Sequence, residues 1–516
     1  MALDHELAAA VAQSDQDRAA SSPASPVMHP ARSSRRRHAI TLVVVGAVLA
    51  TLATAVGATF IGPRANTNDA SPGQTGADGS PDLAGSLAGS STGLGPLPGS
   101  GATGAVAIAS GAESAALLAK RTDALIRYYE GRTETDRDAT ELRVLASLYL
   151  ARGRVTGDAA TYLRAQAAAT RAQGLAPQDP EVIAILASTD ATLHEFASAR
   201  SLGESVLATH PTAFGARAIV GDAALETGDY AAASQSYAAL AAALPNNSGV
   251  LVRQARLASI QGNLPLARTF AAKASAAALA EGAFGTALAF PRILQGKLAM
   301  DAGQYAQAER FYRQGLQAAD SWHVALAGLA RARAAQGDLV GATSWLQRAI
   351  DVVPLPEYLA ALGDVLTARG DTRSAASAYA TVDATASLTG SRLYDRQRVL
   401  FLADHAIAPD ARTAQAVSLA QSELDARKDV FGYDALAWAL LADGRANEAL
   451  ASVHSALALG TEDPLLHYHA GMVYAAVGDS PAAISELRRA LTQSPHFDLL
   501  GARRATATLT SLSAKR

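Results

Sequence analysis

Stretches of about a dozen residues, each with its apolar positions on one helical face, alternate with glycine-centred turns along the second half of the chain. Successive turns are 33 or 34 residues apart, except for one interval of 41 and one of 74. The turns are Gly228-Asp229, Gly262-Asn263, Gly303-Gln304, Gly337-Asp338, Gly370-Asp371, Gly444-Arg445 and Gly478-Asp479. This spacing indicates a 34-residue unit with a few insertions and predicts a solenoid of helical hairpins.

Each recurring position in the unit has a mechanical reason. In the unit that begins at His323, Ala330 lies seven residues before the turn glycine, where a small side chain lets two helices cross closely. Gly337 supplies a backbone angle that a residue with a Cβ resists, and Pro354 prevents the second helix from continuing. The pattern therefore predicts two helices per unit.

With these positions the chain resembles the tetratricopeptide repeat family, in a bacterial membrane-anchored form. That family has small residues at its eighth, twentieth and twenty-seventh places and a proline near its thirty-second. The residues that carry the resemblance are Gly221, Gly228, Tyr230, Ala233, Tyr237 and Pro245 in one unit, Gly296, Gly303, Tyr305, Ala308 and Tyr312 in another, and Leu436, Ala437, Gly444 and Ala449 in a third. The resemblance implies an all-α, right-handed superhelical solenoid of about ten units over residues 113–500, with a C-terminal cap over 501–516. Units near 139 and 390 and the insertion Ser275–Ala283 depart from the family pattern.

Residues 39–61 contain no charge, and 23 residues of helix suffice to cross a membrane. Arg32, Arg35, Arg36 and Arg37 precede the segment, so we expect residues 1–38 to be a disordered cytoplasmic segment and the repeats to be extracytoplasmic. A signal anchor is the first interpretation. A signal peptide cleaved after Ala55 or Ala58, or a buried soluble helix, are the alternatives. Residues 62–112 are rich in Gly, Ser and Pro, which predicts a disordered linker.

Composition narrows the functions further. The chain has no cysteine, which excludes disulfides, thiolate metal sites and cysteine nucleophiles. With a formal net charge of -3, the chain lacks the overall excess of positive charge that is typical of nucleic-acid-binding proteins. We recognise no motif for a cofactor, and we expect no metal site at His467 and His469, because residues two apart on a helix point in different directions. An enzyme is the alternative to a binding protein: the helical array could frame a hydrolytic site that acts on polymers of the cell envelope.

The inner surface of the superhelix is the predicted binding surface. The ninth place of three successive units carries Arg256, Lys297 and Arg331, a ladder of cations that could hold a carboxylate or an acidic peptide. These residues could instead be solvated, or paired with Asp222, Asp301 and Asp364.

Toward the C-terminus the same inner surface becomes apolar at Phe431, Trp438, Tyr468 and Met472. These residues could receive hydrophobic side chains of a partner, or could be covered by Phe497, Leu499 and Leu500 and the last helix. The sequence thus favours a non-enzymatic, membrane-tethered scaffold for proteins or peptides; a secreted cell-envelope binding protein is the alternative.

Overall fold

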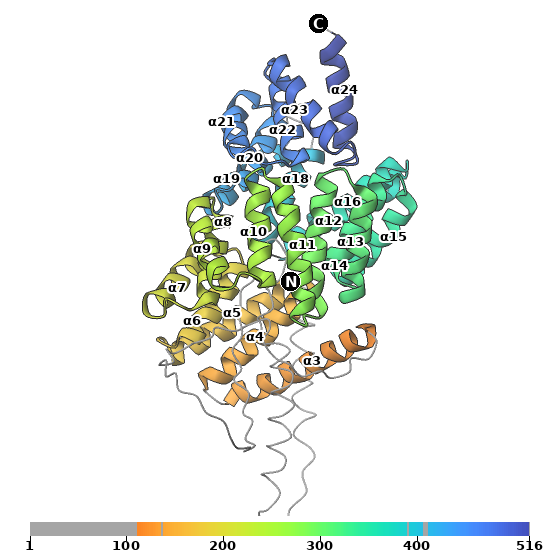
Figure 1. The fold of residues 1–516 in the computed structure, drawn as a ribbon. Coiled ribbons are helices and arrows are strands. Elements are labelled where there is room, and N and C mark those ends of the chain that lie inside the picture. Colours follow the sequence, from red (N-terminus) through yellow and green to blue (C-terminus); the bar gives the residue numbers. More distant parts are fainter. Residues whose placement is uncertain (1–110, 136–137, 390–391, 406–410, 515–516) are drawn as a thin grey trace, which may run out of the picture. The chain divides into compact units, whose positions relative to one another are not determined.

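The computed structural model describes residues 111–514 except 136–137, 390–391 and 406–410, and all its regular elements in these ranges are helical (Figure 1). The all-helical prediction is therefore confirmed for this part of the chain. The helices are α3 (Gly111–Thr135), α4 (Ala139–Thr156), α5 (Ala159–Leu175), α6 (Pro180–Thr192), α7 (Phe196–Thr209), α8 (Phe214–Glu226), α9 (Tyr230–Ala243), α10 (Ser248–Ile260), α11 (Leu264–Ala280), α12 (Gly285–Asp301), α13 (Tyr305–Ala318), α14 (His323–Ala335), α15 (Leu339–Val352), α16 (Pro356–Ala368), α17 (Thr372–Thr389), the short 3-10 helix η1 (Arg392–Tyr394), α18 (Asp395–His405), α19 (Ala411–Ala426), α20 (Val430–Ala442), α21 (Ala446–Leu457), α22 (Pro464–Ala476), α23 (Ser480–Gln493) and α24 (Gly501–Ala514).

Ten helix pairs follow one another in the described ranges, from pair 1 (α4–α5) to pair 10 (α22–α23), and successive pairs pack side by side (Figure 1). The glycine-aspartate turns explain how each pair forms. Gly228 ends α8 with φ 80°, and the Asp229 side chain accepts a hydrogen bond from Ala232 N at 3.1 Å, which caps α9. The turn therefore ends one helix and begins the next within two residues.

Inside several pairs a glycine of the first helix faces a tyrosine of the second, sixteen residues later. A Cβ added at Gly221 would lie 2.7 Å from the Tyr237 ring, and one at Gly296 would lie 2.6 Å from the Tyr312 ring. Tyr237 and Tyr312 are almost fully buried. The small residue at the eighth place is therefore required because an aromatic ring occupies the space that a Cβ would take.

Where the sequence departs from the repeat pattern, the helix pairs still follow one another in the stack. Most of the insertion at Ser275–Ala283 lengthens α11, which continues to Ala280, and His194 takes the place of a turn glycine with φ 64°. The predicted span 39–61 and the segments on either side of it, up to residue 110, lie outside the described residues. None of the helices in the described ranges is long and apolar enough to cross a membrane.

The turns of early pairs contact the ends of later pairs with a constant offset. The turn glycines Gly157, Gly228, Gly262 and Gly303, of pairs 1, 3, 4 and 5, lie against Val353, Lys428, Gly460 and Gln493, where pairs 6, 8, 9 and 10 end. Each of these turns thus meets the end of the pair five positions later. The stack therefore returns to itself after between five and six pairs. We call the contact between a turn and the end of the pair five positions later a return contact.

Hydrogen bonds to the backbone accompany the return contacts. The Tyr230 hydroxyl accepts from Val430 N at 3.0 Å, and the Tyr305 hydroxyl accepts from His496 N at 2.7 Å. Ser494 is fully buried, and its Oγ donates to Met300 O at 2.9 Å. The bond from Ser494 is buried, so it satisfies two polar groups that would otherwise be costly to remove from water, whereas the bond to Tyr305 is exposed.

The return contact leaves no room for a Cβ at the turn glycine, which gives a matched pair of substitutions. A Cβ at Gly228 would lie 2.2 Å from Lys428 O, whereas one at Gly444, with nearly the same φ of 79°, would meet nothing within 4 Å. We predict that G444A costs about 1 kcal/mol for its left-handed backbone alone, and that G228A costs about 2 kcal/mol more. Urea unfolding of both variants measures the difference; equal losses would contradict the close approach of the two turns.

Candidate functional site

The stacked pairs form a partly open cavity of about 1340 Å³. Its lining comes mainly from the first helices of pairs 4 to 10, which are α10, α12, α14, α16, α18, α20 and α22, and from the segment that follows α23. Most of the lining side chains are apolar; representative ones are Ile260, Ile293, Leu298, Val365, Phe401 and Phe431. An apolar cavity with a few polar groups is the usual form of a binding site.

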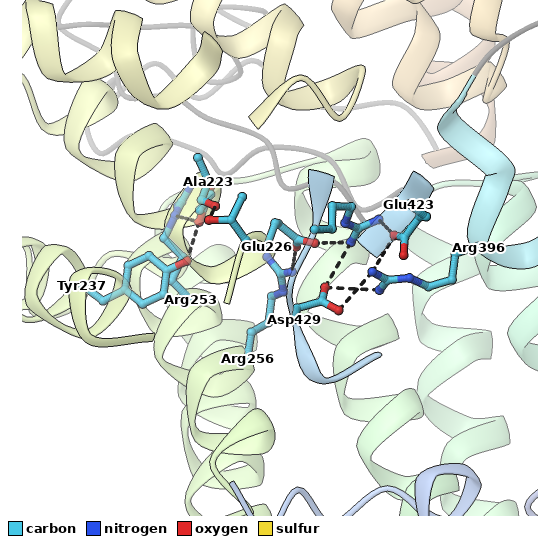
Figure 2. A network of polar contacts seen from close by, with 11 residues as sticks. Ala223, Glu226, Tyr237, Arg253, Arg256, Arg396, Glu423 and Asp429 are labelled. Atoms are coloured by element: carbon cyan, nitrogen blue, oxygen red, sulfur yellow. Dashed lines mark hydrogen bonds and ion pairs between the residues drawn. The ribbon is translucent and has the colours of Figure 1, made fainter. Parts of the chain in front are cut away.

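A network of six buried charges lies where the turn of pair 3 meets the end of pair 8 (Figure 2). Each side chain is 13% exposed or less. We call these residues the latch network; they are Glu226, Arg256, Arg396, Glu423, Arg427 and Asp429. Because three positive and three negative groups are buried together, the network has no net formal charge.

Glu226, at the end of α8, joins the two parts of the latch network. Arg256 Nη2, from α10, donates to Glu226 Oε1 at 2.5 Å, and Arg427 Nη2 donates to Glu226 Oε2. Arg427 lies 201 residues along the chain from Glu226. One carboxylate therefore links the neighbouring pair 4 and the distant pair 8.

Arg396, on α18, completes the network on the far side. Its Nη2 lies 2.6 Å from Glu423 Oε1 and 3.0 Å from Asp429 Oδ1. Burial lowers the pKa of Arg396, but the adjacent Asp429 and Glu423 more than offset that effect, so the pKa is raised above its ordinary value. The guanidinium therefore remains charged in the buried site.

A second buried ion pair ties pair 3 to pair 4 beside the latch network (Figure 2). Arg253, from α10, binds both oxygens of Asp222: Nε donates to Oδ1 at 2.9 Å and Nη2 donates to Oδ2 at 2.7 Å. The Tyr237 hydroxyl also donates to Asp222 Oδ1 at 2.7 Å. Asp222 is thus occupied by Arg253 and Tyr237, and it is Glu226 that binds Arg256.

The three predicted ladder residues, Arg256, Lys297 and Arg331, all line the cavity, but each has a partner within the chain. Lys297 Nζ lies 2.7 Å from Asp301 Oδ2 and 3.8 Å from an Asp463 oxygen. Arg331 Nη2 donates to the Phe497 carbonyl oxygen at 3.0 Å. With Arg256 held by Glu226, the ladder is present as a set of residues but not as a row of unpaired cations.

Of the predicted apolar residues, Phe431 and Tyr468 line the cavity, whereas Trp438 and Met472 do not; Met472 is half-buried and packs on the core cluster that contains Trp438. Trp438 is 5% exposed and stacks on His469, with ring centroids 4.1 Å apart. Phe497 follows α23 and lies 5.3 Å from the Tyr468 ring. The chain's own C-terminal segment thus covers much of this face, as the capping alternative requires, and Phe431 is left half-buried.

Three carboxylates of the lining were not predicted to form a group; of these, Asp364 was considered only as a partner for the ladder of cations. Asp364 lies on α16, Asp404 lies near the end of α18 and Asp498 follows α23. Burial raises the pKa of Asp364 to about 7 and that of Asp404 to about 6, and Asp498 adds to both shifts. We call these three residues the carboxylate cluster. The raised pKa values of Asp364 and Asp404 indicate that nearby cations do not offset the effect of burial on these two groups.

Two further titratable residues, Glu357 and His405, belong to the lining. Burial raises the pKa of Glu357 to about 7, and its Oε2 atom is buried without a hydrogen-bond partner. His405 Nε2 lies 3.3 Å from Asp364 Oδ1, but burial lowers the His405 pKa to about 4. The imidazole is therefore neutral near pH 7 and gives Asp364 no positive partner.

The histidines named from the sequence have separate carboxylate partners. His467 Nδ1 lies 2.7 Å from Glu486 Oε2, and His469 Nδ1 lies 2.9 Å from Asp434 Oδ2. Within the described ranges, no group of three or more His, Asp or Glu side chains is arranged to hold a metal ion.

No family model and no curated protein matches the chain. Similar solved structures include human IFIT1, as a dimer with PPP-AAAA, at 15% identity and TM-score 0.40, covering 67% of this chain and 79% of that one. A tetratricopeptide repeat protein from Parabacteroides merdae is 13% identical, with TM-score 0.35 and coverage of 47% and 88%. Yeast Tom70 is 11% identical, with TM-score 0.33 and coverage of 77% and 93%. These values support no argument, so the architecture rests on the helix pairs themselves.

We expect a large loss in the free energy of unfolding when the charge that joins the two parts of the latch network is removed. E226Q leaves Arg256 and Arg427 buried without their shared carboxylate, so we expect a loss of about 3 kcal/mol. Hydrogen exchange should accelerate at the amides of residues 427–432.

The matched control for that substitution is E448Q, which removes an ion pair with Arg445 on the surface, where Glu448 is 59% exposed. This variant should change neither stability nor exchange at residues 427–432 appreciably. If both variants behave alike, Glu226 does not hold the two parts of the stack together.

The raised pKa of Glu357 leads us to expect that the stability of the fold depends on pH. Its carboxyl stays protonated up to about pH 7 in the folded chain but ionises near 4.5 when exposed, so unfolding releases a proton between these values. The stability of the wild type should therefore fall as pH rises through this window. Relative to the wild type, E357Q should gain on the order of 2 kcal/mol from about pH 5 to about pH 8.

Urea midpoints of both proteins at each end of that range measure the gain. E448Q serves as the control, because Arg445 lowers the pKa of Glu448 and the sign of its small effect is opposite. A constant difference between E357Q and the wild type would show that Glu357 is not held in its neutral form.

Proposed function

We propose that this chain is a non-enzymatic scaffold, tethered to a membrane through residues 39–61, whose repeats bind a protein or peptide segment outside the cytoplasm. The observation that carries the binding role is the cavity of about 1340 Å³, lined mainly by the first helices of seven successive pairs. Its volume exceeds the roughly 300–1,000 Å³ of sites for small ligands, which favours a stretch of polypeptide. The resemblance of the repeat unit to tetratricopeptide repeats agrees with that role.

The tether is supported by the sequence. A charge-free stretch of 23 residues follows a cluster of arginines, and positive charge favours the cytoplasmic side. As a flexible coil, the linker over residues 62–112 would span on the order of 40 Å. The repeats would then stand clear of the membrane surface while remaining attached to it.

The absence of native cysteine allows one experiment to test location and binding together. V340C introduces a thiol at a position on α15 that is 68% exposed and outside the cavity lining. F431C introduces one in the lining. We expect an impermeant maleimide to label V340C in intact cells, and a photoactivatable maleimide on F431C to cross-link a protein that the same reagent on V340C does not.

Labelling of V340C only after lysis would reverse the proposed orientation. Recovery of the labelled chain in the medium, with an N-terminus after Ala55 or Ala58, would replace the tether with secretion. The same adducts from both positions would argue against binding through the cavity.

A further inference from the structure

The three ladder cations of the cavity, Arg256, Lys297 and Arg331, lie among carboxylates of the chain itself. Glu226 holds Arg256, and Asp301 with Asp463 holds Lys297. Burial lowers the pKa of Arg331, but Asp301 and other carboxylates nearby raise it above its ordinary value, so this guanidinium also lies in a negative field. A negatively charged occupant would therefore have to compete with carboxylates that are already in place.

The carboxylate cluster is in the opposite situation. Its nearest basic group with a defined contact is Arg504, whose Nη1 lies 3.9 Å from Asp404 Oδ1. That guanidinium is 44% exposed, so water and salt screen its effect. Asp364 is contacted by the Tyr379 hydroxyl and by His405, both neutral near pH 7.

The remaining charged groups around the cluster do not reverse this balance. Asp498 accepts hydrogen bonds from Leu500 N and Gly501 N, which caps α24, and it is also one of the carboxylates that raise the pKa of Arg331. Arg503 lines the cavity from α24 and is exposed. Burial lowers the pKa of His469, but Asp434, Asp404 and Asp498 raise it above its ordinary value. Arg412, whose guanidinium lies 5.7 Å from the centre of the Phe401 ring, is a further cation on this side of the cavity. Burial and the negative charge of Asp498 nevertheless keep the pKa values of Asp364 and Asp404 raised.

Aromatic and apolar surface adjoins the cluster. Phe401, Tyr358 and Phe431 line the same cavity, and so does Tyr468, which is 1% exposed. The Tyr468 hydroxyl lies near the Arg504 guanidinium, which can only donate to it, so no group in the described ranges accepts the hydroxyl proton. That proton is therefore available to a carbonyl group of an occupant.

We propose that the cavity binds a segment of a partner protein in which arginine or lysine stands beside large apolar side chains, with the cation placed against Asp364 and Asp404. This inference rests on the proposed function and names the chemistry of the partner. Carboxylates and aromatic rings both attract a guanidinium, and the apolar lining accepts the neighbouring side chains. The charge preference is the reverse of the acidic partner that the ladder of cations predicted.

The test uses the full-length chain in mild detergent and a display library of short random peptides. Peptides retained by the wild type should be enriched in arginine and lysine next to apolar residues. A synthetic peptide of the retained sequence should bind roughly tenfold more tightly than its glutamine-substituted form. The preference should weaken between about 50 and 500 mM salt.

D364N/D404N should lose the preference for basic peptides while keeping its stability, because asparagine can still accept the hydrogen bonds from Tyr379 and Trp438. D320N/D351N is the matched control: it changes the net charge equally at two exposed positions outside the lining, and should select the same peptides as the wild type.

Enrichment of acidic or uncharged peptides, or a basic preference that survives in D364N/D404N, would overturn the proposal. So would competition by free spermidine as effective as that of the peptide, because the occupant would then be a small amine. If no peptide is retained but the F431C cross-link still forms, the charge inference fails and the proposed function stands. If neither occurs, both fail.

Discussion

Close approach of backbone to backbone at the turn glycines is the constraint on which the rest of the structure depends. A residue with a Cβ at Gly228 or Gly262 would meet a carbonyl oxygen 2.2 Å away, so the stack could not return to itself at that spacing. Only when the turns lie this close can Glu226 reach Arg427 and bury the latch network. Closure of the cavity is therefore a consequence of small residues at a few turns, reinforced by charges that would be unfavourable alone.

Burial of charge at the return contact also determines what the cavity can bind. Glu226 serves Arg256 on the lining and Arg427 on the distant loop, so forming the contact removes one cation from the inner surface. Asp463, near the end of pair 9, likewise approaches Lys297 of pair 5. The interactions that close the stack thus help to neutralise Arg256 and Lys297 in the lining, while Asp364 and Asp404 have no buried cation as an equivalent partner.

The sequence predicts the helix pairs because their determinants are local. Gly221 and Tyr237 belong to one unit, so their spacing reveals their contact. The return contact cannot be predicted this way: Gly228 and Gly444 are both turn glycines with nearly the same φ, yet only Gly228 meets another loop. The same holds for the site. The three cations were found by register, but their partners depend on distant pairs, and Asp404 lies in a divergent unit where no register could be assigned.

The C-terminal segment shows how one stretch of chain satisfies two requirements at once. A solenoid needs its last pair covered, and α24 packs on α22 and α23 to do so. The constant offset also requires the end of pair 10 to meet the turn of pair 5, and Ser494 makes that contact at Met300. Phe497 lies between these two fixed points, so its ring falls on Tyr468 and its carbonyl oxygen on Arg331. A segment held at both ends in this way forms a wall of the cavity, and a partner must therefore fit beside it rather than replace it.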